Sequence, residues 1–396
     1  MKRKISILLI LILVVSGFLT ACNKDSDILT YQVNSGDTIY IGALLPISGG
    51  YKSQGEFLSD GILFAQKTAE NINIDKDYKI ELLTKDITDL DSAYTEFVNK
   101  KVSGVICCGT DKATTDSIIT KFKDSTIPLI FTDNYSSGIS ESKTVFSIAI
   151  SDFYKASCMA SHLDAENLTK GAVLILDDDP EKQTFADMLA KSAESSGIVV
   201  TKYFASGENA NYKPQSIVSM DYEFICIDGS VLDSLNTVKS LRDQGFFGEV
   251  IISEVADKTM LNSDCDGIAF INKFDYDDDN YIGSDFLNVY SNNADISSAV
   301  AYGYDAYLLM YQALLSFAKD SGDPLSAVKN NSNDGNTEET VITTKDLTKS
   351  LQEISYYGVT DTISFDDNGI TKVNFLYVHE IQGNCAVMLN KFKYSN

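Results

Sequence analysis

The feature that most constrains the fold is a regular alternation of short apolar runs with longer segments of helical periodicity. Residues 40–45 suit a buried strand, and in residues 55–70 the apolar side chains recur at helical spacing. This alternation continues to residue 131, and a second series runs from residue 173 to 271. Such alternation is typical of parallel sheets covered by helices on both faces. Because the series occurs twice, the sequence predicts an α/β chain with two similar lobes.

The individual elements follow from the same periodicities. Strands are expected at 40–45, 80–83, 104–108, 128–131, 173–176, 198–203, 224–227, 250–252, 267–271, 372–378 and 385–389. Helices are expected at 55–70, 91–101, 113–124, 181–196, 231–243 and 297–318.

The N-terminus predicts export. Three basic residues are followed by an apolar run and then by Leu19-Thr20-Ala21-Cys22, which is typical of a signal peptide. The run is shorter than the roughly 20 residues of a spanning helix. The ending resembles the lipobox of bacterial lipoproteins, which implies cleavage after Ala21 and acylation of Cys22. The alternative is an ordinary secretory signal with a chance cysteine. We therefore expect residues 1–21 to be removed, 22–37 to form a linker, and the protein to be lipid-anchored at the extracytoplasmic face of the cell membrane.

Composition limits the partners. The net charge of −24 disfavours nucleic acid and anionic membrane surfaces, which would repel the chain. The 44% hydrophobic content is ordinary for a folded protein. Cys107 and Cys226 lie in apolar runs, where free cysteine behaves as a small hydrophobe. With two histidines and no CxxC pair, we expect no metal site.

Catalytic motifs are missing. No glycine-rich phosphate or dinucleotide loop follows a strand, and no G-x-S-x-G elbow occurs. We therefore expect a binding protein that needs no cofactor, rather than an enzyme. A cell-surface hydrolase that uses carboxylates is the less favoured alternative.

Five segments in order resemble the branched-chain amino-acid type substrate-binding proteins of ABC transporters. They are IYIGALLPISGGYKSQGEFLSDGILFAQKTAEN, SGVICCGTDKATTD, IPLIFTDNY, GAVLILDDDPEKQTFADMLAKSAESSGIVV and the pair YDAYLLMYQAL with ISFDDNGITK. The resemblance implies a type I periplasmic-binding-protein fold, with two Rossmann-like lobes joined by a three-stranded hinge. It implies crossovers near 150–153, 272–277 and 356–361. Lobe 1 would comprise 38–151 and 277–356, and lobe 2 would comprise 152–276 and 357–396.

The resemblance also implies a ligand site. In open parallel sheets, ligands bind beyond the carboxyl ends of the strands, where helix N-termini suit a carboxylate. The positions that match the family's contact residues are, in lobe 1, Ser48, Gln54, Thr110, Asp111, Asn134 and Tyr135, and, in lobe 2, Phe185, Ser230 and Glu254.

Several of these residues also have a simpler interpretation. Ser48 can belong to a turn only, Asp111 can be a helix cap, and Tyr135 a surface aromatic. Glu254 matches the acidic residue that pairs with the ligand's ammonium; the less favoured alternative is an acid at a helix start. Asp111 and Tyr135 add charge and bulk where relatives carry small residues, which disfavours a branched aliphatic ligand.

The sequence thus predicts a solute-binding lipoprotein of an ABC importer. Its ligand would be an amino acid or a similar small zwitterion, delivered to a membrane permease. The alternative is a ligand-sensing receptor subunit of the same fold that takes no part in transport.

Overall fold

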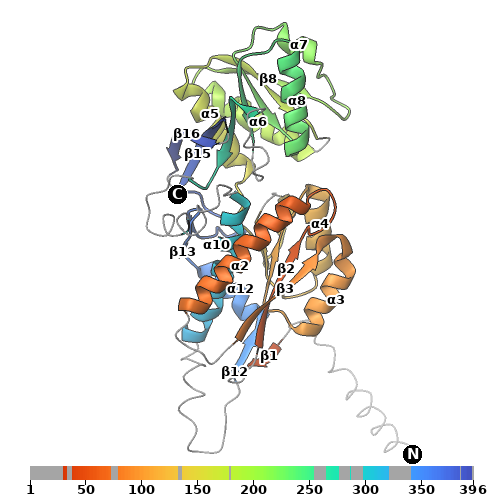
Figure 1. The fold of residues 1–396 in the computed structure, drawn as a ribbon, viewed down its shortest axis with the longest axis vertical. Coiled ribbons are helices and arrows are strands. Elements are labelled where there is room, and N and C mark those ends of the chain that lie inside the picture. Colours follow the sequence, from red (N-terminus) through yellow and green to blue (C-terminus); the bar gives the residue numbers. More distant parts are fainter. Residues whose placement is uncertain are drawn as a thin grey trace, which may run out of the picture.

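The computed structural model describes residues 30–33, 38–72, 79–132, 136–177, 180–253, 265–275, 286, 298–320, 340–383 and 385–394. Two α/β lobes lie one beyond the other along the long axis, lobe 1 below and lobe 2 above (Figure 1). The predicted fold class is confirmed. Within the described residues, no helix is both long and apolar enough to cross a bilayer.

Lobe 1 is built on a parallel five-stranded sheet of order β3-β2-β4-β5-β6. Its strands are β2 (Thr38–Leu45), β3 (Lys79–Asp86), β4 (Val105–Cys107), β5 (Leu129–Phe131) and β6 (Val145–Ser147). Its helices are α2 (Lys52–Ile72), α3 (Leu90–Lys100), α4 (Lys112–Phe122), α10 (Ser298–Asp320) and α12 (Thr344–Glu353), with 3₁₀ turns η1 (Ile87–Asp89) and η2 (Ser137–Glu141). The central strands are buried on both faces, which explains their unbroken apolar runs.

Two glycines let α2 and α10 pack in backbone contact. A Cβ atom at Gly61 would lie 2.0 Å from the carbonyl oxygen of Val300, and one at Gly303 would lie 2.3 Å from that of Leu58. Only glycine fits at such distances, so these two residues set the separation of the helices.

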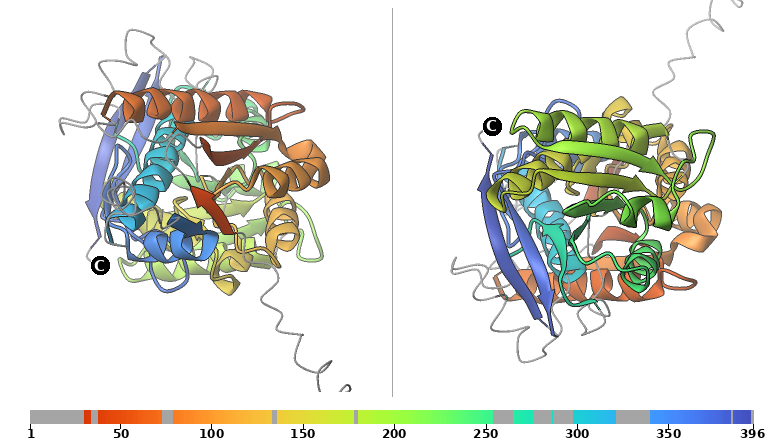
Figure 2. Two further views of the ribbon diagram at one scale, coloured as in Figure 1. Left: turned by 90° about the horizontal axis from the view of Figure 1, so that it is seen from below. Right: turned by 90° about the horizontal axis from the view of Figure 1, so that it is seen from above.

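Lobe 2 contains a seven-stranded sheet of order β16-β15-β11-β10-β9-β7-β8. Its strands are β7 (Lys170–Ile175), β8 (Val199–Phe204), β9 (Phe224–Asp228), β10 (Glu249–Ile252), β11 (Ile268–Asn272), β15 (Phe375–Gln382) and β16 (Cys385–Lys393). Its helices are α5 (Asp152–Ala165), α6 (Pro180–Glu194), α7 (Pro214–Val218) and α8 (Val231–Asp243). The β15–β16 hairpin pairs antiparallel with β11 along one flank of the molecule (Figure 2), so this sheet is mixed.

Two short pairs complete the fold. Strand β1 (Thr30–Val33) pairs antiparallel with β12 (Thr340–Thr343) at the far end of lobe 1 (Figure 1). Strands β13 (Tyr356–Tyr357) and β14 (Thr362–Ile363) form a second antiparallel pair.

Three chain connections join the lobes. Ile148 packs in lobe 1 and Ile150 in lobe 2, and likewise Phe274 packs in lobe 1 and Ile271 in lobe 2. The third connection lies between Ile370, which packs in lobe 1, and Val373, which packs in lobe 2. It comes later than the predicted 356–361, because the β13–β14 pair packs against the core of lobe 1.

The cysteines carry no disulfide among the described residues. Cys107, Cys108, Cys158, Cys226 and Cys265 are buried, whereas Cys385 is exposed. Cys107 and Cys226 lie inside β4 and β9, as their apolar surroundings predicted.

Candidate functional site

Tyr51 lies within electrostatic range of carboxylates from both lobes. This residue follows β2 of lobe 1, and its side chain is 41% exposed. Partial burial raises the pKa of Tyr51, as do the carboxylates of Asp111 in lobe 1 and of Asp177 and Asp233 in lobe 2. Groups from both lobes therefore share one local environment. We call Ser48, Tyr51, Thr110 and Asp111 of lobe 1, with Asp177, Asp228, Ser230 and Asp233 of lobe 2, the interlobe site.

Ser48 lies in the turn between β2 and α2. Gly49 adopts φ +78°, a conformation that favours glycine, which closes the turn. Ser48 is exposed, and its Oγ lies 3.4 Å from Thr88 Oγ1. Burial alone would raise the pKa of Asp86, but hydrogen bonds from Ser48 and Thr88 outweigh it and lower that pKa. The carboxylate at the end of β3 thus holds this turn in place.

Gln54 lies in the first turn of α2 and is partly buried. The backbone amide of Gly55 donates to Tyr51 O at 3.2 Å, so Tyr51 and Gln54 belong to the same helix start. From the sequence, Gln54 was named as a ligand contact and Tyr51 was not. The signal that could have identified Tyr51 is its position as an aromatic residue directly after the Ser-Gly-Gly turn.

Thr110 is held in a strained conformation after β4. Its φ is +52°, which is rare for a β-branched residue. The Asp111 amide donates to Gly109 O at 2.5 Å across it. Non-glycine residues in this region cost about 1–3 kcal/mol and cluster at functional sites.

Asp111 caps α4. Its carboxylate accepts from the Thr114 amide at 2.7 Å, and the side chain is partly buried. The simpler interpretation of Asp111 therefore describes its contacts in this structure. The cap uses one of the free amides at this helix start.

The site in lobe 2 is built around a buried ion pair. Asp228, the last residue of β9, lies 3.0 Å from Lys182 Nζ of α6. Burial would raise the pKa of Asp228, but Lys182, Lys155 and the Ser253 hydroxyl outweigh it and lower that pKa. Burial would also lower the pKa of Lys182, but the carboxylates around it, led by Asp228, raise it. Both groups therefore stay charged at neutral pH.

Ser230 and Asp233 form the start of α8. Ser230 Oγ accepts from the Asp233 amide at 3.2 Å and donates to its carboxylate at 2.6 Å. This places the Ser230 hydroxyl in a helix cap, at the same edge of the sheet as Asp228.

Phe185 was expected to contact the ligand, but the structure places it in the core of lobe 2. Its side chain is fully buried in the core between α6 and α5, with Ala156 and Met159. Because it has no exposed surface, it presents nothing to lobe 1 in this structure. The helical stripe of α6 accounts for its burial.

Cys22, Asn134, Tyr135 and Glu254 lie outside the described residues. The strands that lead to three of them are described. Thr132, just after β5, donates to Cys107 O at 3.2 Å, and Ser253 follows β10 beside Asp228. Asn134, Tyr135 and Glu254 therefore stay predictions.

Metal-binding chemistry has no support in the described part of the chain. It contains no group of three or more His, Cys, Asp and Glu side chains that could hold an ion.

The sequence matches one family model. A model described as periplasmic binding protein matches residues 38–385. No curated protein matches the chain.

Solved structures share the fold at low identity. A leucine-binding protein from Thermotoga maritima is 16% identical, with 90% of this chain and 99% of that chain covered and a TM-score of 0.71. A branched-chain amino-acid transporter substrate-binding protein from Streptococcus pneumoniae, in complex with isoleucine, is 18% identical, with 89% and 99% covered and a TM-score of 0.69. A solute-binding protein from R. palustris, in complex with benzoate, is 15% identical, with 89% and 96% covered and a TM-score of 0.69.

Proposed function

This chain belongs to the periplasmic binding protein family, and on that premise we propose that it is the solute-binding protein of an ABC importer. The observation that carries the proposal is the interlobe site, where Tyr51 of lobe 1 shares its electrostatic environment with Asp177 and Asp233 of lobe 2. A small molecule that contacts both lobes would stabilise the conformation in which they are closed. The family is one of substrate-binding proteins rather than enzymes.

The proposed ligand is an amino acid or a similar small zwitterion. Solved structures of the same fold hold isoleucine in one case and benzoate in another, which share a carboxylate on a small apolar body. In this chain the start of α4, beside Thr110, offers backbone amides suited to a carboxylate. Asp177 and Asp233 offer negative charge to an ammonium group. Asn134, Tyr135 and Glu254 are proposed to complete the two ends of the site.

Exposed apolar side chains at the facing ends of the lobes support closure. Ile47 and Tyr51 of lobe 1 are 39% and 41% exposed, and Phe153 and Leu232 at the starts of α5 and α8 are 60% and 68% exposed. Burying apolar surface contributes about 25 cal/mol per Å². Partial burial of these four side chains on closing would therefore add to the free energy of ligand binding.

We propose that the protein is anchored through Cys22 at the extracytoplasmic face of the membrane, after removal of residues 1–21. A lipid at this position would leave residues 23–29 between the anchor and β1 at the far end of lobe 1. Incorporation of labelled palmitate, lost in Cys22→Ser, is the expected result. Equal labelling of the variant would contradict the anchor.

A thermal-shift screen tests the binding proposal. The protein is heated with amino acids, amides, nucleosides and aromatic acids, and hits are confirmed by calorimetry. We expect an α-amino compound to raise Tm without product formation. Stabilisation by another solute class alone would overturn the zwitterion assignment, and turnover of the ligand would overturn the binding role.

Two variants refine the test. Glu254→Gln is expected to weaken zwitterion binding by more than about tenfold, roughly 1.4 kcal/mol. Glu353→Gln, at an exposed position on α12, is the matched control and should bind as the unchanged chain does.

Docking on a permease is the remaining part of the proposal. The ligand-loaded protein should stimulate ATP hydrolysis by its permease and ATPase in proteoliposomes. Binding of ligand without any stimulation would favour the sensing role instead.

A further inference from the structure

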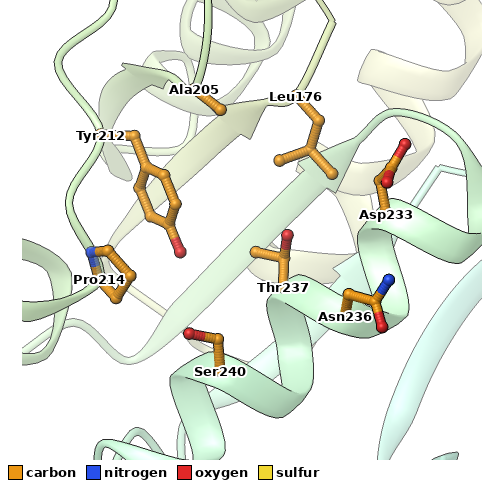
Figure 3. A pocket seen from close by; sticks show the side chains of 8 residues that line it. All are labelled: Leu176, Ala205, Tyr212, Pro214, Asp233, Asn236, Thr237 and Ser240. Atoms are coloured by element: carbon orange, nitrogen blue, oxygen red, sulfur yellow. The ribbon is translucent and has the colours of Figure 1, made fainter.

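Lobe 2 contains a hollow of about 340 Å³ on the face where α8 meets the connection from β8 to α7 (Figure 3). Its volume is within the range of about 300–1,000 Å³ that is usual for ligand pockets. All of its lining residues belong to lobe 2. They are Leu176, Ala205, Tyr212, Pro214, Asp233, Asn236, Thr237 and Ser240.

One side of the hollow is a polar stripe on α8. Asp233, Asn236, Thr237 and Ser240 have the spacing i, i+3, i+4 and i+7, which places them on one face of the helix. Thr237 is partly buried, and Ser240 Oγ accepts a long hydrogen bond of 3.4 Å from Gln244. This face therefore presents two hydroxyls, an amide and a carboxylate to the hollow.

The opposite side holds a hydroxyl without a hydrogen bond. Tyr212 points its ring and hydroxyl toward Thr237 and Ser240 (Figure 3). The Tyr212 hydroxyl is shielded from solvent and has no partner in the structure, and its burial raises the pKa of Tyr212. Nearly all buried polar groups in proteins have a partner, so an orphaned hydroxyl at a cavity indicates a missing one.

The connection that carries Tyr212 is firmly held. The amides of Asn211 and Tyr212 both donate to Phe204 O, at 3.0 and 3.1 Å. Asn211 Oδ1 accepts from the Phe204 amide at 2.8 Å, and Ser206 Oγ donates to Leu176 O at 2.9 Å. The backbone at Tyr212 is therefore positioned before any ligand arrives, which lowers the cost of binding.

The lining also selects a chemical class. None of the lining residues is a Lys, Arg or His, and Asp233 contributes negative charge, so anions are disfavoured. Hydroxyls and an amide both donate and accept, and the Tyr212 ring, Leu176 and Pro214 supply apolar surface. Such a set matches a small molecule with several hydroxyl groups on a carbon framework.

We propose that this hollow is a second binding site, specific for a neutral polyhydroxylated molecule such as a monosaccharide or a linear polyol. The ligand would donate to or accept from Tyr212, Thr237 and Asn236, and a pair of its hydroxyls would donate to Asp233. The site lies within lobe 2, needs no lobe closure, and shares only Asp233 with the interlobe site.

Titration calorimetry and ligand-observed NMR test the proposal on the purified chain. The neutral probes are D-glucose, D-galactose and sorbitol, with gluconate as the anionic counterpart. We expect saturable binding of at least one neutral probe and at least tenfold weaker binding of gluconate. Tyr212→Phe and Thr237→Val should each weaken the neutral probe at least fivefold. Tyr357→Phe and Thr120→Val, at surface positions in lobe 1, are the matched controls and should leave its binding unchanged.

Two further readouts separate this site from folding effects and from the interlobe site. Tyr212→Phe should keep the Tm of the ligand-free chain or raise it, because the orphaned hydroxyl is removed. It should also leave binding to the interlobe site unchanged, because Tyr212 does not belong to that site. The absence of binding by every neutral probe, or equal binding by Tyr212→Phe and Thr237→Val, would overturn the proposal.

Discussion

Lys273 Nζ lies 3.4 Å from the carbonyl oxygen of Ile148, which joins the second connection between the lobes to the first. The same ammonium lies 3.5 Å from Thr371 Oγ1 in the third connection. Lys273 is fully buried, and burial lowers its pKa. A buried cation that contacts all three connections ties the chain together at the junction of the lobes.

Asp305 of α10 is the buried carboxylate that faces this lysine. It accepts from the Val359 amide at 2.9 Å and from the amide and hydroxyl of Thr360 at 2.8 and 2.6 Å. Burial raises the pKa of Asp305 to about 6, although Thr360, Val359 and Lys273 oppose the rise. The folded chain therefore holds this proton more tightly than the unfolded chain does.

Asp305 should therefore stabilise the folded chain more at low pH than at neutral pH. The stabilisation from the protonated carboxyl is fully present below the unfolded pKa of about 3.9 and is lost as pH rises through about 6. The stability advantage of the native chain over Asp305→Asn should thus shrink by up to about 3 kcal/mol between pH 4 and 7. Urea unfolding at several pH values measures it, with Asp124→Asn at an exposed position as control. An advantage that stays constant with pH would contradict the assignment.

His162 should also stabilise the folded chain more at low pH than at high pH, but over a higher pH range than Asp305. It is buried between Glu249 and Asn390, whose hydrogen bonds outweigh the burial and raise its pKa. Its contribution is present below an unfolded pKa of about 6.5 and is lost as pH rises through the higher folded value. We expect the advantage of the native chain over His162→Gln in urea to fall above pH 6.5.

His379 should show the opposite pH dependence and therefore serves as a control. Burial lowers its pKa to about 4, so its contribution is present above about 6.5 and is lost as pH falls toward 4. The comparison with His379→Phe should therefore change in the reverse direction. Parallel trends for the two histidines would show that one of the two pKa shifts is misassigned.

Thr110→Gly separates strain from ligand contact. Relief of the φ of +52° should raise the free energy of unfolding by about 1 kcal/mol. Loss of the hydroxyl should weaken binding of the interlobe ligand by about fivefold or more. Asn167→Gly, at φ +58° just after α5 in lobe 2, is the control and should leave affinity unchanged. Unaltered affinity in Thr110→Gly would remove Thr110 from the site.

Gly61→Ala should disrupt the crossing of α2 and α10. The new methyl group would lie 2.0 Å from Val300 O, and relieving this clash should cost about 1–3 kcal/mol or more. At Gly50 nothing lies within 4 Å, so Gly50→Ala should stay within about 0.5 kcal/mol of the native chain. Chemical unfolding compares them, and equal stability of the two variants would refute the close crossing.

Much of the fold was predictable because its central elements are strongly periodic. The residue ranges expected for β2, β9 and α8 lie close to those observed, since their apolar spacing is regular. Helix α5 was not predicted. Buried Lys155 and His162 interrupt its apolar stripe, and only tertiary partners such as Glu249 make that burial tolerable.

The site was predictable in position more than in detail. The ends of strands mark where Ser48, Thr110 and Ser230 lie. Tyr51 and Asp177 were missed because their proximity depends on the relative placement of the lobes. Phe185 was misplaced because an aromatic residue near a helix start serves a core as readily as a ligand.

Small-angle scattering with and without ligand tests the central claim most directly. Once calorimetry has identified a solute for the interlobe site, the radius of gyration is measured for the ligand-free and the saturated protein at equal concentration. Two lobes that close on a shared ligand predict a smaller radius and a shorter maximum dimension at saturation, and both changes should be lost on titrating the ligand away. Identical profiles at full saturation would contradict the account.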